Sequence, residues 1–296
     1  MSEVRIVLPA TLNTFTLRGV ISDFVDKCQN GLPDKVIIDF GFLGFIHPSG
    51  VTFLSNFVHW LHHRGLRCDF YQHTRNGQAH RFLDDSLFFE QHLGNKLNVY
   101  RGPRRTTQHL RRVEHAESHY FIRGTLGPWL ADALNTNNAS LYPFQVCLSE
   151  IFNNIQDHSD RDNGSIFAQH FPNINLVRIA IADFGRGIPH NVANVVPDIS
   201  HNEAIIKAVE AGFSTKSTPR NRGAGLDYLL QTVVGTNGGE VTISSFNGMV
   251  RFLPMGGGCR PTPVLTAGFC PGTTIDIELR TDTIIPVEDE PEDLEW

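Results

Sequence analysis

The sequence predicts an α/β protein with two domains. The chain has 296 residues, which is longer than a typical single domain with one hydrophobic core. Over the first 105 residues, short β-branched or apolar runs alternate with segments of helical spacing, the pattern of a small α/β layer sandwich. Further along, strand candidates end in glycine-rich turns that lead into helices. We expect a first domain at 1–105, a second at 106–286 and an acidic flexible tail at 287–296.

The elements of the first domain follow from the spacing of apolar residues. The run KVIIDF at 35–40 is β-branched and compact, as in a buried parallel strand. A strongly apolar helix is predicted at 51–63. The other expected elements are strands at 4–8 and 66–71, a helix at 16–28 and one or two helices within 78–93.

Composition argues against several classes of function. Hydrophobic residues make up 41% and charged residues 19%, which is ordinary for a soluble globular protein. The formal net charge of −6 provides no global basic field, so no nucleic-acid or membrane partner is expected. No apolar run approaches the roughly 20 residues that span a bilayer, and the N-terminus lacks the features of a signal peptide. We therefore expect a cytoplasmic protein. The five scattered cysteines form no CxxC pair, which argues against a zinc or redox motif.

Arginines gather between the two expected domains, at Arg101, Arg104, Arg105, Arg111 and Arg112. Such a run can form a nucleic-acid patch. It is more often a solvated linker or an exposed helix, and no aromatic residues are interleaved to stack on bases. A solvated linker is the favoured interpretation.

The residues at 39–61 resemble a STAS domain, the fold of anti-sigma-factor antagonists. That family places a strand, a loop ending in Asp-Ser-x-Gly and then a helix. Here the loop reads IHPSG, with His47 at the position of the aspartate and Pro48 at that of the phosphorylated serine. Proline has no hydroxyl to receive a phosphate. Ser49 remains a candidate acceptor, although the N-cap of the following helix is the favoured role. The resemblance implies a STAS-like fold without its usual phosphorylation switch.

Three polar residues of the second domain recur every four positions, at Glu150, Asn154 and His158. This spacing places them on one face of a helix. An apolar face beside them is supplied by Val146, Leu148, Ile151, Phe152 and Ile155. The simpler interpretation is the polar face of an ordinary surface helix.

A second motif begins with apolar residues at 177, 179 and 181, whose alternation predicts a strand that ends at Asp183. Gly185 and Gly187 follow. A carboxylate at a strand end can accept a hydrogen bond from an exocyclic amine, and glycines allow the backbone to approach a ligand closely. The alternative is a glycine turn after a buried strand.

Two further glycine motifs follow in the chain. Gly223 and Gly225 lead to Leu226, which opens an apolar helix, and such turns present free backbone N–H groups to phosphate. Before them, Lys216, Arg220 and Arg222 are candidates for phosphate contact or for exposure to solvent. The last motif is Gly272-Thr273-Thr274, which leads into a strand at 275–279, with Thr274 as the candidate hydroxyl.

The four motifs, in this order, resemble the GHKL nucleotide-binding fold of gyrase, Hsp90, histidine kinases and MutL. The resemblance implies a GHKL (Bergerat) α/β sandwich with a mixed sheet and helices on one face, which binds ATP with Mg²⁺. It implies that Asn154 ligates Mg²⁺, that Glu150 is the catalytic general base and that Asp183 binds the adenine amino group. The implied nucleotide-binding residues are Asn154, His158, Asp183, Gly185, Gly187, Lys216, Arg222, Gly223, Gly225, Leu226 and Thr274.

Several uses of ATP fit these residues. One is hydrolysis or an ATP-gated conformational switch in a regulatory protein, which we favour. Another is a serine/threonine kinase like the anti-sigma factors, acting on a STAS partner, and a third is a non-enzymatic module that binds a protein partner. A sensor histidine kinase is disfavoured, because the segment before the ATP-binding region is too short for a dimerisation hairpin and is interrupted by Gly124, Gly127 and Pro128. A homodimer fits any of these functions.

Overall fold

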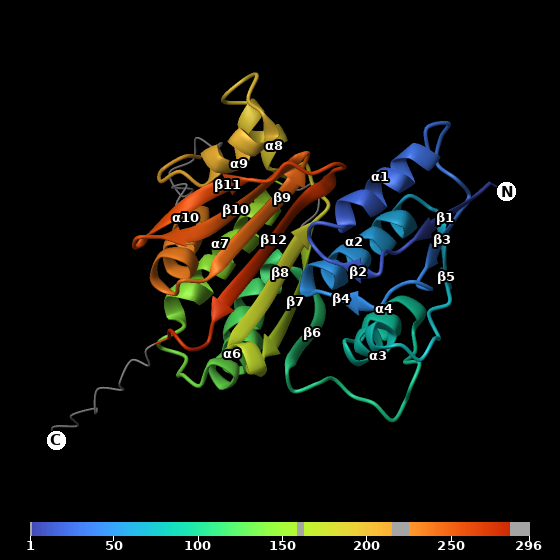
Figure 1. Ribbon diagram of the computed structural model, residues 1–296, viewed down its shortest axis with the longest axis horizontal. Coiled ribbons are helices and arrows are strands. Elements are labelled where there is room, and N and C mark those ends of the chain that lie inside the picture. The colour runs from blue at the N-terminus through green and yellow to red at the C-terminus, as the bar shows by residue number, and fades with distance from the viewer. Residues whose placement is uncertain (1, 159–162, 215–224, 285–296) are drawn as a thin grey trace.

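The computed structural model describes residues 2–158, 163–214 and 225–284, with the side chains of 156–163 left undescribed. The chain is a mixed α/β protein that contains a large antiparallel sheet, a smaller parallel sheet and helices (Figure 1). Within the described residues, no helix is both long and apolar enough to cross a membrane.

The N-terminal unit is built on a three-stranded parallel sheet. Its strands are β1 (Glu3–Val7), β3 (Lys35–Asp39) and β5 (Arg67–Tyr71), in the order β1-β3-β5. A separate parallel pair joins β2 (Thr11–Leu12) to β4 (Phe45–Ile46). The helices of this unit are α1 (Leu17–Lys27), α2 (Pro48–His63), α3 (Gln78–Asp85) and α4 (Phe88–Leu93). The strand and helix alternation predicted for this part of the chain is therefore present.

The C-terminal part of the described chain is built on a seven-stranded sheet, with the strand order β11-β10-β9-β12-β8-β7-β6. Its strands are β6 (Thr107–Glu114), β7 (Asn163–Phe171), β8 (Leu176–Asp183), β9 (Glu240–Phe246), β10 (Gly248–Met255), β11 (Gly258–Pro263) and β12 (Cys270–Arg280). The expectation of a mixed sheet is wrong, because every neighbouring pair in these described strands is antiparallel. β8 and β9 do run parallel to each other, but β12 lies between them and pairs with both.

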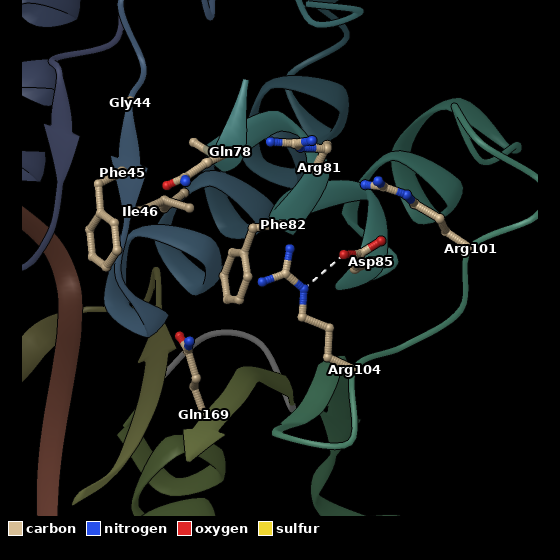
Figure 2. A pocket seen from close by; sticks show the side chains of 11 residues that line it. Gly44, Phe45, Ile46, Gln78, Arg81, Phe82, Asp85, Arg101, Arg104 and Gln169 are labelled. Atoms are coloured by element: carbon tan, nitrogen blue, oxygen red, sulfur yellow. Dashed lines mark hydrogen bonds and ion pairs between the residues drawn. The ribbon is translucent and has the colours of Figure 1, made fainter. Parts of the chain in front are cut away.

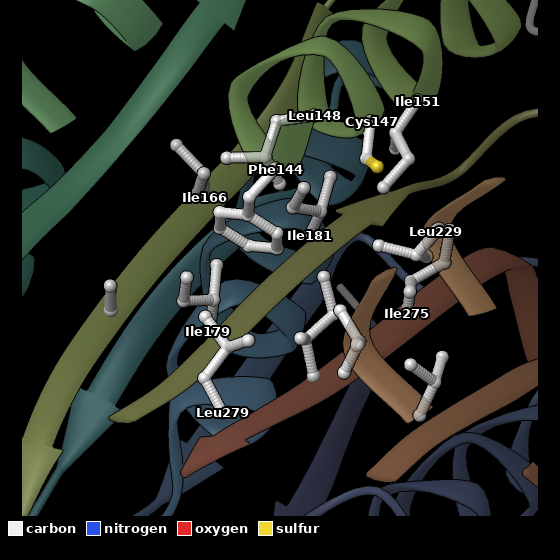
Figure 3. Close-up of a cluster of buried hydrophobic side chains, with 14 of the residues drawn as sticks. Phe144, Cys147, Leu148, Ile151, Ile166, Ile179, Ile181, Leu229, Ile275 and Leu279 are labelled. Atoms are coloured by element: carbon white, nitrogen blue, oxygen red, sulfur yellow. The ribbon is translucent and has the colours of Figure 1, made fainter. Parts of the chain in front are cut away.

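One face of this sheet carries helices from the same part of the chain. They are α5 (His115–Phe121), α6 (Gly127–Leu134), α7 (Tyr142–His158), α8 (Gly187–Ala193), α9 (His201–Ala208) and α10 (Gly225–Leu230). Short π-helical segments at Ile122–Leu126 and Gln231–Thr236 extend α5 and α10, and a 3₁₀ turn at Pro172–Ile174 links β7 to β8. Figure 3 shows α7 side chains packed on Ile166, Ile179, Ile181 and Ile275 of the sheet. This helix-covered face holds one of the two hydrophobic cores.

The opposite face of the large sheet is covered by the N-terminal unit (Figure 1). Helix α2 packs against β7, β8 and β12 on one side and against β5 and α4 on the other. This explains why α2 is apolar around most of its circumference, since a helix between two layers must bury both sides. Leu110, Phe167 and Cys270 of the large sheet belong to the same buried cluster as the N-terminal core. The two parts of the chain therefore share a core.

Arg18 of α1 anchors this contact. Its guanidinium is fully buried and donates to the hydroxyl of Ser244 and the carbonyl of Gly248, both from Nη1, at 3.0 and 3.1 Å. Nη2 donates to the carbonyls of Asn247 and Gly268 at 3.0 and 2.5 Å. A buried cation is tolerated only when its donors are satisfied, so these bonds fix α1 on the β9–β10 turn and on the loop before β12.

The loop that resembles the STAS phosphorylation site lies inside the same interface. His47 is the N-cap of α2 and Pro48 its first residue, so the predicted N-cap role of Ser49 is wrong. The reason is that proline has no N–H and a fixed φ that suits the first helical position. Ser49 is fully buried beside Asp276 of β12. Burial raises the pKa of that carboxyl, and a 2.5 Å hydrogen bond from the hydroxyl of Thr14 acts in the lowering direction.

Candidate functional site

Helix α7 carries the first of the predicted motifs. Leu148, Ile151 and Phe152 are buried against the sheet, while Glu150 and Asn154 are half-buried on another side of the helix. The three apolar residues follow helical spacing, and their burial orients the polar side. The side-chain amide of Asn153 donates to Glu150 Oε1 at 3.3 Å. The carboxylate of Glu150 is thus held by the residue three positions further along.

Gly225 begins α10 directly against Glu150. A Cβ built on Gly225 would lie 2.8 Å from the Cβ of Glu150, closer than real side chains approach. Only glycine fits here without a shift of one helix. The next residue, Leu226, packs on the edge of the apolar core, and α10 runs along α7. The structure therefore brings the first and third sequence motifs into contact, as their assignment to one site requires.

Asp183 ends β8, on the sheet face that α7 covers. Its side chain is 8% exposed, and its Oδ1 accepts a hydrogen bond of 2.6 Å from the backbone N–H of Gly185. Burial raises the pKa of Asp183 to about 6, while backbone hydrogen bonds from Gly185 and Thr273 act in the lowering direction. The carboxylate is thus nearly dry and retains acceptor capacity, as recognition of a ligand amine requires.

Two hydroxyl side chains stand beside Asp183 in adjacent strands. Thr273 of β12 is the register partner of Asp183 and also of Ser245 in β9. Directly opposed residues in an antiparallel sheet point to the same face. The hydroxyl of Ser245 lies 3.3 Å from that of Thr273 and accepts from the backbone N–H of Ile188 at 3.0 Å. A carboxylate and two hydroxyls therefore form a polar row across β8, β12 and β9.

Thr274, the threonine predicted to contact the nucleotide, does not belong to this row. It pairs with Ala182 of β8 and with Ser244 of β9, and it is fully buried beside Cys270, 3.4 Å from that thiol. Successive side chains of a strand point to opposite faces. Thr274 consequently faces the N-terminal unit, and Thr273 is the threonine on the face of Asp183.

Glycines shape the backbone around Asp183. Gly187 has φ of +73°, and a Cβ there would lie 2.6 Å from the ring of Phe246. Gly272 has φ of +65°, and a Cβ there would lie 2.3 Å from the carbonyl oxygen of Asp183. Both positions combine a left-handed backbone with a contact that no side chain tolerates. Both glycines therefore let the backbone pack closely beside Asp183, and the predicted approach of Gly185 and Gly187 to a ligand stays a prediction.

Several predicted residues cannot be placed. Lys216, Arg220, Arg222 and Gly223 lie outside the described residues, and so does the expected cationic segment before α10. His158 is the last residue of α7, but its side chain is also outside the described part of the structure.

The site contains residues that the sequence did not single out. Ser245 and Thr273 are ordinary strand residues whose importance depends on register. His115 of α5 donates a 2.8 Å hydrogen bond from Nε2 to the amide oxygen of Asn153, whose amide nitrogen in turn donates to Glu150. No spacing signal in the sequence connects His115 to Glu150. The Gly-Thr pair at 272–273 was the one available clue to Thr273.

Helix α7 offers oxygen donors of the kind that a hard cation prefers. Within the described residues, no group of three or more His, Cys, Asp or Glu side chains could hold a metal ion on its own. Mg²⁺ keeps several waters and uses one or two protein oxygens together with phosphates. The amide of Asn154 and the carboxylate of Glu150 are oxygen donors of that kind, one helical turn apart.

Comparison with known proteins gives little further guidance. No family model matches the chain, and no curated protein matches it. Among solved structures, it is similar to the B subunit of the DNA gyrase from Myxococcus xanthus, with 16% identity and a TM-score of 0.23. The match covers 39% of this chain and 31% of the gyrase chain, so it spans about a third of that protein. A TM-score this low establishes no common fold.

Proposed function

We propose that the chain is a regulatory protein that binds ATP with Mg²⁺ between α7 and the polar row of Asp183, Thr273 and Ser245. The observation that carries this proposal is the contact of Gly225 with Glu150 on the same sheet face as Asp183. It brings together two motifs that lie 75 residues apart in the sequence, at Glu150 and Gly225, and Asp183 of a third motif lies on the same face of the sheet.

Each residue has a specific part in this proposal. The carboxylate of Asp183 accepts a hydrogen bond from the adenine amino group, and the hydroxyl of Thr273 contacts the base beside it. The free N–H groups at the start of α10 hold phosphate. Asn154 provides an oxygen to Mg²⁺, which neutralises phosphate charge when bound. Glu150 orients the attacking water or removes its proton.

Hydrolysis or a nucleotide-dependent switch is favoured over transfer to the chain's own N-terminal unit. Ser49 is fully buried in the interface with β12, and Pro48 has no hydroxyl. Neither residue can receive a phosphoryl group while α2 is docked. We propose that residues 1–105 and 106–286 are separate domains in origin that act as one regulatory unit, which binds a further protein partner. Phosphorylation of that partner, as by an anti-sigma-factor kinase, is the alternative use of the same site.

The test compares wild-type protein with Glu150→Gln, which retains the shape of the side chain. ATP affinity is measured by calorimetry with Mg²⁺ and with EDTA, and phosphate release is measured with γ-labelled ATP. A general base contributes about a hundred- to ten-thousand-fold to turnover and little to affinity. We expect Glu150→Gln to bind ATP like wild type and to release phosphate at least about a hundredfold more slowly.

A matched control is Glu117→Gln in α5, an acidic residue exposed on the surface of the same domain. It should change neither binding nor turnover. Labelled protein in place of free phosphate would favour the kinase alternative. ATP binding without free phosphate or labelled protein would indicate a nucleotide-gated binding module. If the chain does not bind ATP at millimolar concentration, the whole proposal is overturned.

A further inference from the structure

A pocket lies at the junction between the N-terminal unit and the large sheet, with a volume of about 440 Å³ (Figure 2). Its walls come from β4, from α3, from the segment that joins the two parts of the chain and from Gln169 of β7. It shares no residue with the polar row at Asp183 or with the face of α7. Its volume is within the range of about 300–1,000 Å³ that small-molecule sites have.

The pocket is rich in positive charge. Arg81 of α3 and Arg101 and Arg104 of the connecting segment line it, together with a single carboxylate, Asp85. Arg104 donates from Nε to Asp85 Oδ2 at 2.7 Å. Throughout the part of the chain that the structure describes, no ion pair or hydrogen bond is found for the guanidinium groups of Arg81 and Arg101. Three guanidiniums against one carboxylate leave an excess of two positive charges at a concave site.

The rest of the lining is apolar or neutral. Ile46, Ala79 and Phe82 are buried in the wall, and the guanidinium of Arg104 lies 5.1 Å from the centre of the Phe82 ring. This contact and the bond to Asp85 fix Arg104 on two sides, so its charge is held at the pocket. Gln169 adds an amide whose Oε1 is buried and has no hydrogen-bond donor among the described residues. The pocket therefore has a cationic part and a mostly uncharged part.

We propose that this pocket binds a small phosphorylated metabolite. Its phosphate is held by the guanidiniums of Arg81 and Arg101, because planar guanidinium groups match phosphate oxygens in charge and geometry. Its uncharged part lies against Phe82 and the amide of Gln169. Arg101 and Arg104 of the connecting segment thus belong to a ligand site. A concave pocket of this size, with one buried aromatic ring, suits a small molecule better than an extended polymer, which requires a groove with several stacking residues.

A ligand bound in this pocket would also affect the contact between the N-terminal unit and the large sheet. Arg81 and Phe82 belong to the N-terminal unit, Gln169 belongs to the large sheet, and the ring of Phe82 meets that of Phe167 in β7 at 5.7 Å. A ligand that touches both parts stabilises their docked arrangement by mass action. The proposal is independent of ATP binding at Asp183.

The test measures the binding of inorganic pyrophosphate by calorimetry in the presence of EDTA, on the full chain. Wild type is compared with the double variant Arg81→Gln/Arg101→Gln and with Arg105→Gln, a neighbouring exposed arginine that does not line the pocket. A hydrogen bond to a charged group contributes about 1.5–3 kcal/mol, and each 1.4 kcal/mol is about tenfold in affinity. We expect saturable binding to wild type, at least about tenfold weaker binding to the double variant, and no change in Arg105→Gln.

Two further variants separate the outcomes. Gly225→Ala disturbs the proposed ATP site, and loss of pyrophosphate binding in that variant would show that the probe occupies the ATP site, which overturns the proposal. If the double variant does not fold, Arg101→Gln alone, on an exposed segment, decides the question. No binding to wild type, equal weakening by Arg105→Gln, or tighter binding of a single-stranded RNA oligomer through the same arginines would each overturn the small-molecule assignment.

Discussion

The side-chain amide of Asn56 in α2 donates a hydrogen bond of 2.8 Å to the carbonyl oxygen of Ala182, the residue before Asp183. Its oxygen accepts a bond of 2.6 Å from the hydroxyl of Ser165, the register partner of Ala182 in β7. One buried side chain of the N-terminal unit therefore joins two strands directly behind the proposed adenine-binding carboxylate. On the same helix, the ring of Phe53 lies 6.0 Å from that of Phe184.

Removal of this amide should weaken both the fold and the nucleotide site. Asn56→Ala leaves the hydroxyl of Ser165 without its acceptor, and an unsatisfied buried polar group costs about 1–3 kcal/mol of unfolding free energy. Because the end of β8 is then less fixed, we expect ATP affinity to fall by about threefold or more, within the usual range of coupling between sites. Denaturant unfolding and calorimetry measure the two effects.

The control for Asn56→Ala is Ser86→Ala. Ser86 is buried, and its hydroxyl donates a hydrogen bond of 2.6 Å to the carbonyl of Phe82. Both residues belong to the N-terminal unit and are far from Asp183 in the sequence. It should reduce stability without a change in ATP affinity. If both variants bind ATP as tightly as wild type, the N-terminal unit does not position Asp183.

Arg18 should dominate the stability of the contact between the two parts. Arg18→Met keeps much of the side-chain length but removes every donor to the hydroxyl of Ser244 and to four backbone carbonyls. Several buried acceptors lose their partner at once, so we expect the free energy of unfolding to fall by about 3 kcal/mol. Urea denaturation measures this change.

Arg280→Met is the comparison for Arg18→Met. Arg280 pairs with Asp282 at 2.6 Å, but 49% and 39% of the two side chains are exposed, and exposed ion pairs contribute about 0–1 kcal/mol. Its loss should be small. Equal destabilisation by the two variants would contradict the anchoring role of Arg18.

The raised pKa of Asp183 predicts how ATP binding depends on pH. Burial raises this pKa from 3.8 to about 6. Because Oδ1 already accepts from the N–H of Gly185, a proton on the other oxygen would remove the acceptor for the adenine amine. ATP affinity should therefore be constant well above pH 6 and should fall by up to about tenfold per pH unit below it. In the absence of ATP the sign is reversed: the folded state binds the proton more tightly, so this group's contribution to stability is fully present below pH 3.8 and is lost as pH rises through about 6.

Asp183→Asn provides the reference curve, because ATP itself also changes protonation in this range. We expect weaker binding by the variant at neutral pH and no extra loss below pH 6. Parallel affinity curves for wild type and Asp183→Asn would show that this carboxylate is not the titrating acceptor.

The local parts of the fold could be predicted from the sequence. Alternation at 177, 179 and 181 placed the strand before Asp183, and the structure has β8 end at that residue. Glycine at 187 was predicted to allow a close approach, and its backbone has the positive φ that favours glycine. Such features depend on a few neighbouring residues, which is why spacing and residue type are sufficient.

The parts that depend on distant residues could not be predicted. Arg18 bonds residues more than 220 positions away, and Asn56 bonds Ala182 across 126 positions. No periodicity within a segment carries that information. The antiparallel pairing of β12 between β8 and β9 was missed for the same reason, because alternating strands and helices by themselves favour parallel neighbours.

The sequence indicated Thr274, whereas the structure places Thr273 beside Asp183, and the reason again lies in strand pairing. This difference leads to the last prediction. A shift of one residue in a strand moves a side chain to the other face of the sheet, and nothing in the Gly-Thr-Thr sequence indicates which threonine faces Asp183. The register does: Thr273 pairs with Asp183, and Thr274 pairs with Ala182.

Thr273→Val removes a hydroxyl from the polar row and keeps the β-branched shape, so we expect about two- to tenfold weaker ATP binding from the loss of one hydrogen bond. Thr274→Val changes a side chain that faces Cys270 and the N-terminal unit, so ATP affinity should remain at the wild-type value. Calorimetry on the two variants decides between the faces, because the opposite result, a loss only with Thr274→Val, would place the nucleotide on the side of the sheet that α2 covers.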